Sequence, residues 1–146
     1  MTIIVDANIL FSALITPAGK IGDLITHPTS SHRMVTCHYA FVELFKHQSK
    51  IVKYSRQTEA ELVNILDILL RNIAFHNEML IDKAHMLEAE RLTKLVDHFD
   101  MRYVALALQT GGILWTGDKK LATHLKAMEF DRIVNTAELS ALLNIG

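Results

Sequence analysis

Short apolar runs alternate along this chain with longer segments whose apolar residues recur at helical spacing. Runs of this length, rich in β-branched residues, are typical of buried strands. They cover residues 2–5, 33–36, 73–75, 113–115 and 132–134. Helical spacing is found at residues 8–15, 22–27, 38–47, 58–71, 82–96, 100–108, 118–128 and 136–143. This alternation predicts an α/β protein in which helices cover both faces of a mostly parallel central sheet, an α/β/α sandwich.

Local signals support these boundaries and argue against a second domain. Thr58 followed by Glu61 is a capping-box signature for the start of a helix, and Gly111-Gly112 is a typical helix end. No internal repeat, low-complexity tract or flexible linker interrupts the 146 residues. We therefore expect residues 1–146 to form a single domain.

Composition and charge narrow the class of protein. Half of the residues are apolar and 21% are charged, as in compact globular proteins. The net charge of −1 means that affinity for nucleic acid would have to come from a local patch or from metal ions. The single cysteine, Cys37, excludes an intramolecular disulfide and favours a reducing compartment. With no apolar run long enough for a signal peptide or a bilayer, we expect a cytoplasmic protein without a membrane segment.

Acidic residues lie at or near the carboxyl ends of several predicted strands. Asp6 directly follows the first strand, and Asp118 follows the fourth after a Thr-Gly turn. In an open parallel sheet, the carboxyl ends of the strands line the ligand crevice. We therefore expect Asp6 and Asp118 to lie at the same edge of the sheet, the one formed by these carboxyl ends. Glu43 lies on the helix after the second strand, and Asp100 lies in the first turn of the helix before the fourth. We expect the four carboxylates to meet in one cleft at this edge.

Such a cluster has a clear chemical use. Four ionised carboxylates in one crevice would repel one another and would be costly to keep charged. Divalent cations remove this cost, and an all-carboxylate ligand set suits Mg²⁺ or Mn²⁺. Water held by such ions can attack a phosphodiester while a cation stabilises charge on the leaving oxygen.

Each acid also has a purely structural interpretation. Asp6 and Asp118 are good helix N-caps, and Asp100 would complement a helix dipole. Glu43 would fit on the exposed face of its helix. Taken alone, capping explains Asp6 as well as ligation does, and it explains Asp118 better. The joint placement of the four at one predicted edge favours a shared site.

Four segments of the chain resemble the motifs of the PIN-domain family. Residues 3–10, Ile-Ile-Val-Asp-Ala-Asn-Ile-Leu, resemble the first motif, an apolar strand followed by Asp, a variable residue and Asn. Glu43 in Tyr-Ala-Phe-Val-Glu-Leu resembles the second acidic position. Asp100 opens a helix with small residues, like the third, and Asp118 in Leu-Trp-Thr-Gly-Asp-Lys-Lys-Leu resembles the fourth. The motifs follow the family order over nearly the whole chain, and the last two together are the most specific.

This resemblance implies a PIN-like fold and a Mg²⁺- or Mn²⁺-dependent nuclease that acts on RNA. The metal-binding and catalytic residues it implies are Asp6, Glu43, Asp100 and Asp118. Many bacterial and archaeal members resemble VapC-type toxins that a small antitoxin holds inactive, so an antitoxin partner is implied as well. Whether the chain also forms a homodimer stays open.

The resemblance also suggests supporting residues beside the four acids. Asn8 and Thr116 would orient ligands or water by hydrogen bonds. Asp97, three residues before Asp100, would be either an auxiliary ligand or a cap, and the cap is the favoured interpretation.

Basic residues near three of the four acids would contact an RNA substrate. A basic stretch follows Glu43, Arg102 lies two residues after Asp100, and Lys119 directly follows Asp118. Phosphate contacts from these residues would position the strand without reading its sequence. A solvated helix face remains the alternative for any single cation. The candidates for substrate binding are Lys46, Lys50, Arg102 and Lys119. Tyr39 and Tyr103 would be able to stack on bases, although packing is the more common role at such positions.

Other functions fit the sequence less well. The eight histidines are scattered, and no pair has a strong zinc spacing. A haloacid-dehalogenase-like phosphatase also has an aspartate after its first strand, but its second Asp is replaced here by Asn8, which cannot act as a general acid. A nucleotide-binding fold would need a glycine-rich phosphate loop after a strand, and there is none. A catalytically silent PIN-like module that binds RNA or protein remains the main alternative.

Overall fold

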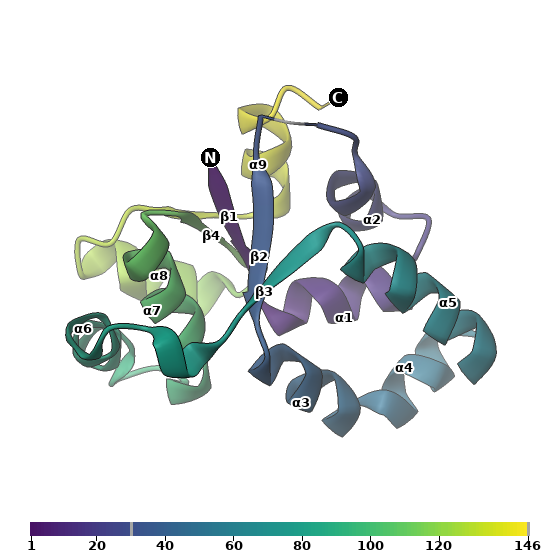
Figure 1. Ribbon diagram of the computed structural model, residues 1–146, viewed down its shortest axis with the longest axis horizontal. Coiled ribbons are helices and arrows are strands. Elements are labelled where there is room, and N and C mark those ends of the chain that lie inside the picture. Colours follow the sequence, from purple (N-terminus) through teal and green to yellow (C-terminus); the bar gives the residue numbers. More distant parts are fainter. Residues whose placement is uncertain (30, 146) are drawn as a thin grey trace.

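One parallel sheet organises the chain, as the computed structural model in Figure 1 shows. The structure describes residues 1–29 and 31–145, apart from the side chain of His98. In these residues, five parallel strands are arranged in the order β3-β2-β1-β4-β5. The strands are β1 (Thr2–Val5), β2 (Arg33–Cys37), β3 (Ile73–His76), β4 (Ile113–Trp115) and β5 (Ile133–Val134).

Helices cover both faces of this sheet, which confirms the predicted α/β/α arrangement (Figure 1). One side carries α1 (Ala7–Ile15), α2 (Lys20–Thr26), α3 (Tyr39–Lys46), α4 (Gln48–Ser55) and α5 (Glu59–Leu70). The other side carries α6 (Lys83–Thr93), α7 (Met101–Thr110) and α8 (Lys119–Ala127). Helix α9 (Thr136–Leu142) follows β5 and contacts α2, and two short 3₁₀ turns are η1 (Glu78–Leu80) and η2 (His98–Asp100). Among the described residues no single helix is long and apolar enough to cross a membrane; only α1 and α2, as a pair bent by 114°, meet the length and composition required.

The central strands explain why the sequence pattern was so clear. Ile3, Ile4 and Val5 of β1 and Leu114 and Trp115 of β4 are completely buried. Strands buried on both faces appear in a sequence as continuous apolar runs rather than as alternating ones. The two strands pair in parallel, with Val5 opposite Trp115, so their carboxyl ends finish side by side.

Two glycines allow β4 to begin beside β1. Gly111 ends α7 with φ of 70°, a left-handed conformation that glycine adopts without strain. A Cβ atom on Gly112 would lie 2.8 Å from the carbonyl oxygen of Thr2, so only glycine fits this close approach. The predicted end of the helix at Gly111-Gly112 is therefore correct.

Helix α4 was absent from the sequence-based expectation. Only Ile51 and Ser55 of its eight residues are buried, so no apolar stripe marks it in the sequence. It ends at Arg56, whose φ of 58° places a residue other than glycine in the left-handed region. Two expected helices are shorter in the structure than in the prediction. The helix expected at residues 38–47 is α3, which ends at Lys46, and the helix expected at residues 82–96 is α6, which ends at Thr93.

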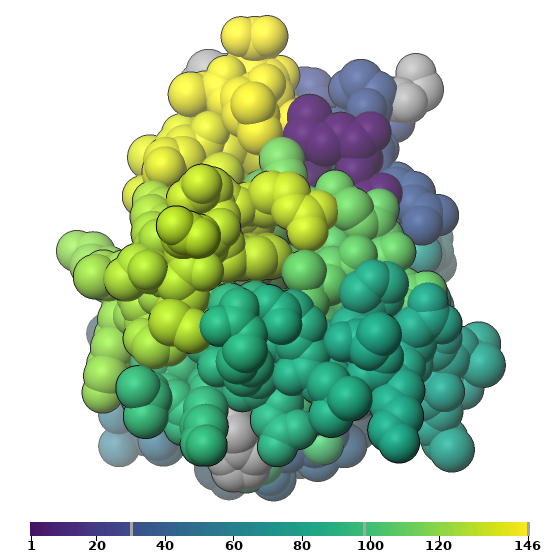
Figure 2. Space-filling model, turned by 90° about the vertical axis from the view of Figure 1, so that its left-hand side faces the viewer, coloured from purple at the N-terminus to yellow at the C-terminus, as the bar shows by residue number. Residues whose placement is uncertain are grey.

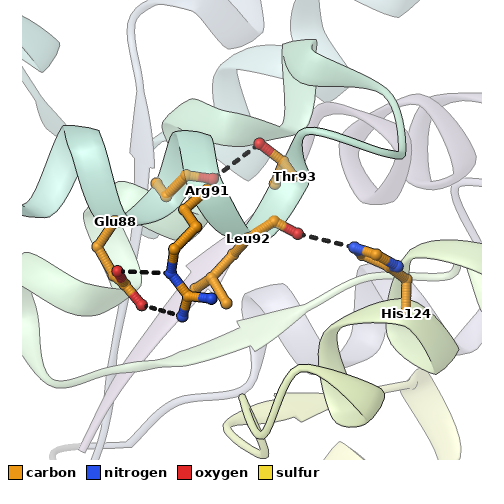
Figure 3. Close-up of polar contacts among 6 residues, drawn as sticks. Glu88, Arg91, Leu92, Thr93 and His124 are labelled. Atoms are coloured by element: carbon orange, nitrogen blue, oxygen red, sulfur yellow. Dashed lines mark hydrogen bonds and ion pairs between the residues drawn. The ribbon is translucent and has the colours of Figure 1, made fainter.

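Helices α6 and α8 meet on the outer surface that Figure 2 shows. Nε2 of His124 lies 3.0 Å from the carbonyl oxygen of Leu92, which joins α8 to the end of α6 (Figure 3). Within α6, Arg91 donates two hydrogen bonds to Glu88, at 2.6 and 3.0 Å, and the Thr93 hydroxyl donates to the carbonyl of Ala89. These contacts fix the chain just before the segment that leads to Asp100.

Candidate functional site

The sheet changes winding direction between β1 and β4. From β1 the chain moves outward to β2 and β3, then returns to the other side of β1 with β4 and β5. In open α/β sheets, ligands bind outside the carboxyl ends of the strands at such a switch point. Asp6 directly follows β1, and Thr116 and Asp118 follow β4, so the topology places all three here.

Asp6 is almost completely buried at this point, with 2% of its surface exposed. Its Oδ1 accepts a hydrogen bond from the backbone N–H of Ile9 at 2.9 Å and so caps α1. Within the described part of the chain, Oδ2 has no hydrogen-bond partner. Burial raises the pKa of this carboxyl to about 6; the nearby Thr116 hydroxyl and the Ile9 N–H oppose the shift only in part, and Glu43 and Asp118 add to it. Capping uses one oxygen of Asp6 and leaves the other available for a cation.

Asp118 also begins a helix beside Asp6. Its Oδ1 accepts the N–H of Leu121 at 3.0 Å, which caps α8. Its own N–H donates to the hydroxyl of Thr116 at 3.1 Å, so Thr116 fixes the turn between β4 and α8. Asn8, at the start of α1, lines the same surface pocket as Asp118. Asn8 and Thr116 are thus neighbours of Asp118, and their supporting role stays a prediction.

Asp100 completes this edge from the start of α7. It is the last residue of η2, and its side chain does not cap the helix that follows. Burial raises its pKa to about 7, with further increases from the charges of Asp6, Asp97, Asp118 and Glu43. All the acidic residues predicted from the sequence are therefore close enough to influence one carboxyl group.

Glu43 approaches the same group of acids from α3. It is half-buried, and its Oε1 accepts a hydrogen bond from the hydroxyl of Tyr103 at 3.2 Å. Burial raises its pKa; the Tyr103 hydrogen bond and the cations Lys46 and Arg102 oppose the shift, while Asp97 adds to it. The exposed-face interpretation of Glu43 is wrong.

Tyr103 positions Glu43 and has no face available to a base. It is 1% exposed, on the side of α7 that packs against the sheet. Its place three residues after Asp100 puts it on the same side of the helix as that acid. This spacing is the one sequence signal for its role.

Glu78 fixes α3 from a distant part of the chain. Its carboxylate accepts the backbone N–H groups of His38 and Tyr39 at 2.9 and 2.8 Å, at the start of the helix that carries Glu43. Partial burial alone would raise the pKa of Glu78, but hydrogen bonds from backbone N–H groups hold it below its ordinary value. Because about 40 residues, with a predicted helix and a predicted strand among them, separate Glu78 from the start of this helix, no sequence signal indicates the contact.

Asp97 and the candidate basic residues lie at different distances from the four acids. Oδ1 of Asp97 accepts the N–H of Phe99 at 3.0 Å, which is a capping contact, while its charge still affects Asp100 and Glu43. Lys46 and Arg102 lie near Glu43. Lys119 is exposed directly after Asp118, and Lys50 is exposed on α4, one helix further along.

The donor set fits a hard divalent cation. The acids supply oxygen ligands alone, and the buried Oδ2 of Asp6 is a polar atom for which a cation would provide the missing partner. Among the described side chains, no three His, Cys, Asp or Glu residues are close enough together to hold a metal directly. Mg²⁺ does not require such a cage, because it commonly keeps several waters and takes one or two carboxylates from the protein.

Comparison with known proteins agrees with this fold. Solved structures with the same fold include PAE2754 from Pyrobaculum aerophilum (19% identity, TM-score 0.68, covering 100% of this chain and 91% of that one). They also include VapBC2 from Rickettsia felis, bound to a DNA fragment from its promoter (14% identity, TM-score 0.68, covering 92% of this chain and 98% of that one). A third is VapBC-1 from nontypeable Haemophilus influenzae (14% identity, TM-score 0.66, covering 94% of this chain and 99% of that one). No curated protein gave a significant match. A family model described as PIN domain matches residues 4–137, and the chain therefore belongs to the PIN-domain family.

Proposed function

We propose that this protein is an endoribonuclease that hydrolyses RNA phosphodiester bonds with the help of Mg²⁺ or Mn²⁺. The observation that carries the proposal is the buried Asp6 carboxylate. Its Oδ2 lacks a partner in the described residues, and it lies at the switch point of the sheet within reach of the charges of Glu43 and Asp118. A purely structural cap would not need a second acidic residue, whereas here the charges of Asp6, Glu43 and Asp118 all act on the carboxyl group of Asp100.

The four acids would contribute to metal binding from four different elements of the fold. Asp6 and Asp118, fixed by their capping hydrogen bonds, would hold the metal from the ends of β1 and β4. Glu43, oriented by Tyr103, and Asp100 would complete the site from α3 and α7, through the waters that Mg²⁺ keeps. When bound, the metal would supply an activated water and would stabilise negative charge on the leaving oxygen. Lys119 and Arg102 would contact phosphates on either side of the bond to be cleaved.

Cleavage of single-stranded RNA tests this proposal directly. We expect hydrolysis that needs Mg²⁺ or Mn²⁺ and stops when EDTA is added. Because water attacks without the 2′-hydroxyl, the products should carry 5′-phosphate and 3′-hydroxyl ends. End-labelled RNA on a sequencing gel, with and without phosphatase treatment, identifies the ends. Metal-independent cleavage or 2′,3′-cyclic phosphates would contradict the mechanism, and binding without cleavage would indicate a catalytically silent module.

We further propose that a small antitoxin protein is the partner of this chain. The motifs of the chain resemble those of VapC-type toxins, which such antitoxins hold inactive. An apolar groove lies between α1, α3, α4 and α5, and none of the four acids lines it. Leu44, Ile51 and Leu62 form part of its floor, and Phe45 and Val63 are 69% and 64% exposed at its rim. Exposed apolar surface of this kind commonly marks a protein-binding site. An apolar segment of the antitoxin would fit it.

Co-purification tests the partner. We expect the product of a short reading frame directly upstream to co-purify with this chain and to inhibit RNA cleavage. Phe45→Glu, which puts a charge at the rim of the groove, should weaken the complex by at least about tenfold, since a buried unpaired charge is costly. Light scattering of the chain alone is the control. A dimer that Phe45→Glu dissociates would show that the groove binds a second copy instead.

A further inference from the structure

Two aromatic rings and two cations form a surface cluster beside Glu43, and the function proposed above gives the two rings no role. We call Tyr39, Phe99, Lys46 and Arg102 the aromatic platform. The rings of Tyr39 and Phe99 are nearly parallel, with 7° between their planes and 6.1 Å between their centroids. The Arg102 guanidinium lies 4.0 Å from the centroid of the Tyr39 ring.

Lys46 joins the two rings. Its Nζ lies 5.6 Å from the centroid of Tyr39 and 5.4 Å from that of Phe99, and it donates a hydrogen bond to the Tyr39 hydroxyl at 3.3 Å. Cations over aromatic faces attract the electron-rich ring, so these contacts hold the cluster together. Part of the cluster is open to solvent, since Lys46 is exposed and 41% of Phe99 is exposed.

The platform is held rigidly and lies next to the acids. Tyr39 is the first residue of α3, where Glu78 accepts its backbone N–H. Lys46 is on the same helix as Glu43, and Arg102 follows Asp100 by two residues. A phosphate held at the acids would therefore place the neighbouring nucleotide over or near these rings.

We propose that the aromatic platform binds an unpaired nucleobase of the RNA next to the bond that is cleaved. The proposal rests on the nuclease function proposed above and adds to it a binding site for one base of the substrate. Aromatic faces stack on any base, and a nearby cation neutralises the phosphate that follows. Bases within a duplex already stack on their neighbours, so the platform favours a single strand. Phe99 supplies the exposed ring, and Tyr39, fixed by Arg102, supports it.

The test uses short single-stranded RNA that carries the fluorescent base 2-aminopurine, whose emission falls when it stacks. Binding is measured with Mg²⁺ in the Asp118→Asn background, where cleavage should be negligible. We expect quenching on binding. We expect Phe99→Ala to abolish the quenching and to raise Kd by about five- to 150-fold, because one base stack is worth about 1–3 kcal/mol. In the cleaving protein, the same change should raise KM and leave kcat within about twofold.

Matched variants separate stacking from packing. Phe99→Trp should preserve quenching, while Phe99→Leu, which keeps apolar contact without a ring, should behave like the alanine variant. Tyr54→Ala removes an exposed ring from α4 and should change neither the quenching nor Kd. Lys46→Ala should reduce the slope of log Kd against log salt by about one. Duplex RNA should bind more weakly and should not respond to Phe99.

The outcomes distinguish this inference from the function on which it rests. If RNA is bound and cleaved but Phe99→Ala changes neither Kd nor quenching, the platform is not a base-binding site and the nuclease stands. If Phe99→Leu binds as the wild type does, the contribution is packing and the stacking proposal is wrong. If the wild-type protein neither binds nor cleaves RNA, the nuclease proposal fails and the inference fails with it.

Discussion

Replacing Asp118 by asparagine is expected to lower the rate of RNA cleavage by at least about two orders of magnitude while the fold stays intact. Asparagine retains the Oδ1 atom that accepts the N–H of Leu121, and asparagine is as good an N-cap as aspartate. What the variant loses is the negative charge at the switch point of the sheet. Loss of one preorganised electrostatic contact at a reacting centre typically costs a factor of about 10² to 10³.

Single-turnover cleavage of end-labelled RNA measures this effect, and a thermal melt confirms that the variant is folded. Asp131→Asn is the matched control, because Asp131 precedes β5 and so lies at the opposite, amino-terminal edge of the sheet. Asp97→Asn should have an intermediate effect of several-fold, since Asp97 acts on Asp100 and Glu43 only through its charge. If Asp118→Asn cleaved RNA at the wild-type rate, Asp118 would be a cap and nothing more.

Asp6 and Asp118 show why the sequence alone could not decide between helix capping and metal ligation. Both residues follow a strand and precede a helix, so either role was consistent with the pattern. The structure shows that the roles are compatible, because Asp6 caps α1 with one oxygen and leaves the other without a partner in the described residues. A choice between the two was never required. The metal role itself remains a proposal.

The fold followed from the sequence wherever burial was complete. β1 and β4 were predicted with the bounds that they have, because all their inner residues are apolar and glycines end the helix before β4. α4 was missed for the opposite reason. It covers α1 and α3 at the surface, so tertiary contacts rather than its own apolar stripe hold it as a helix.

Contacts between distant segments could not be predicted at all. The hydrogen bond from Tyr103 to Glu43 joins residues 60 positions apart, and Glu78 reaches the start of α3 across about 40. The stacking of Tyr39 on Phe99 likewise depends on how η2 lies beside α3. Sequence spacing identifies neighbours on one helix, whereas these contacts depend on how the elements pack.

The metal-free protein should become less stable as the pH rises from about 4 to about 7, and Asp6→Asn should remove part of this loss. An aspartate in the unfolded chain titrates near 4, whereas burial raises the pKa of Asp6 to about 6 and that of Asp100 to about 7. Between these values the unfolded chain has released protons that the folded chain still holds. The stabilisation is therefore complete below about pH 4 and is lost as the pH passes the folded pKa values. With each pKa unit worth about 1.4 kcal/mol, the shift at Asp6 corresponds to about 3 kcal/mol.

Thermal melts in EDTA across this pH range, for the wild type, Asp6→Asn and Asp131→Asn, measure the effect. Asp6→Asn keeps the cap on α1 and removes the buried charge, so above pH 7 it should melt several degrees higher than the wild type, and near pH 4 the difference should vanish. Asp131→Asn should follow the wild type throughout. Added Mg²⁺ should reverse the order, because it stabilises the wild type by binding only the folded state. A lower melting temperature for Asp6→Asn at every pH, with no response of the wild type to Mg²⁺, would mean that the Asp6 carboxylate is a structural group rather than part of a cation site.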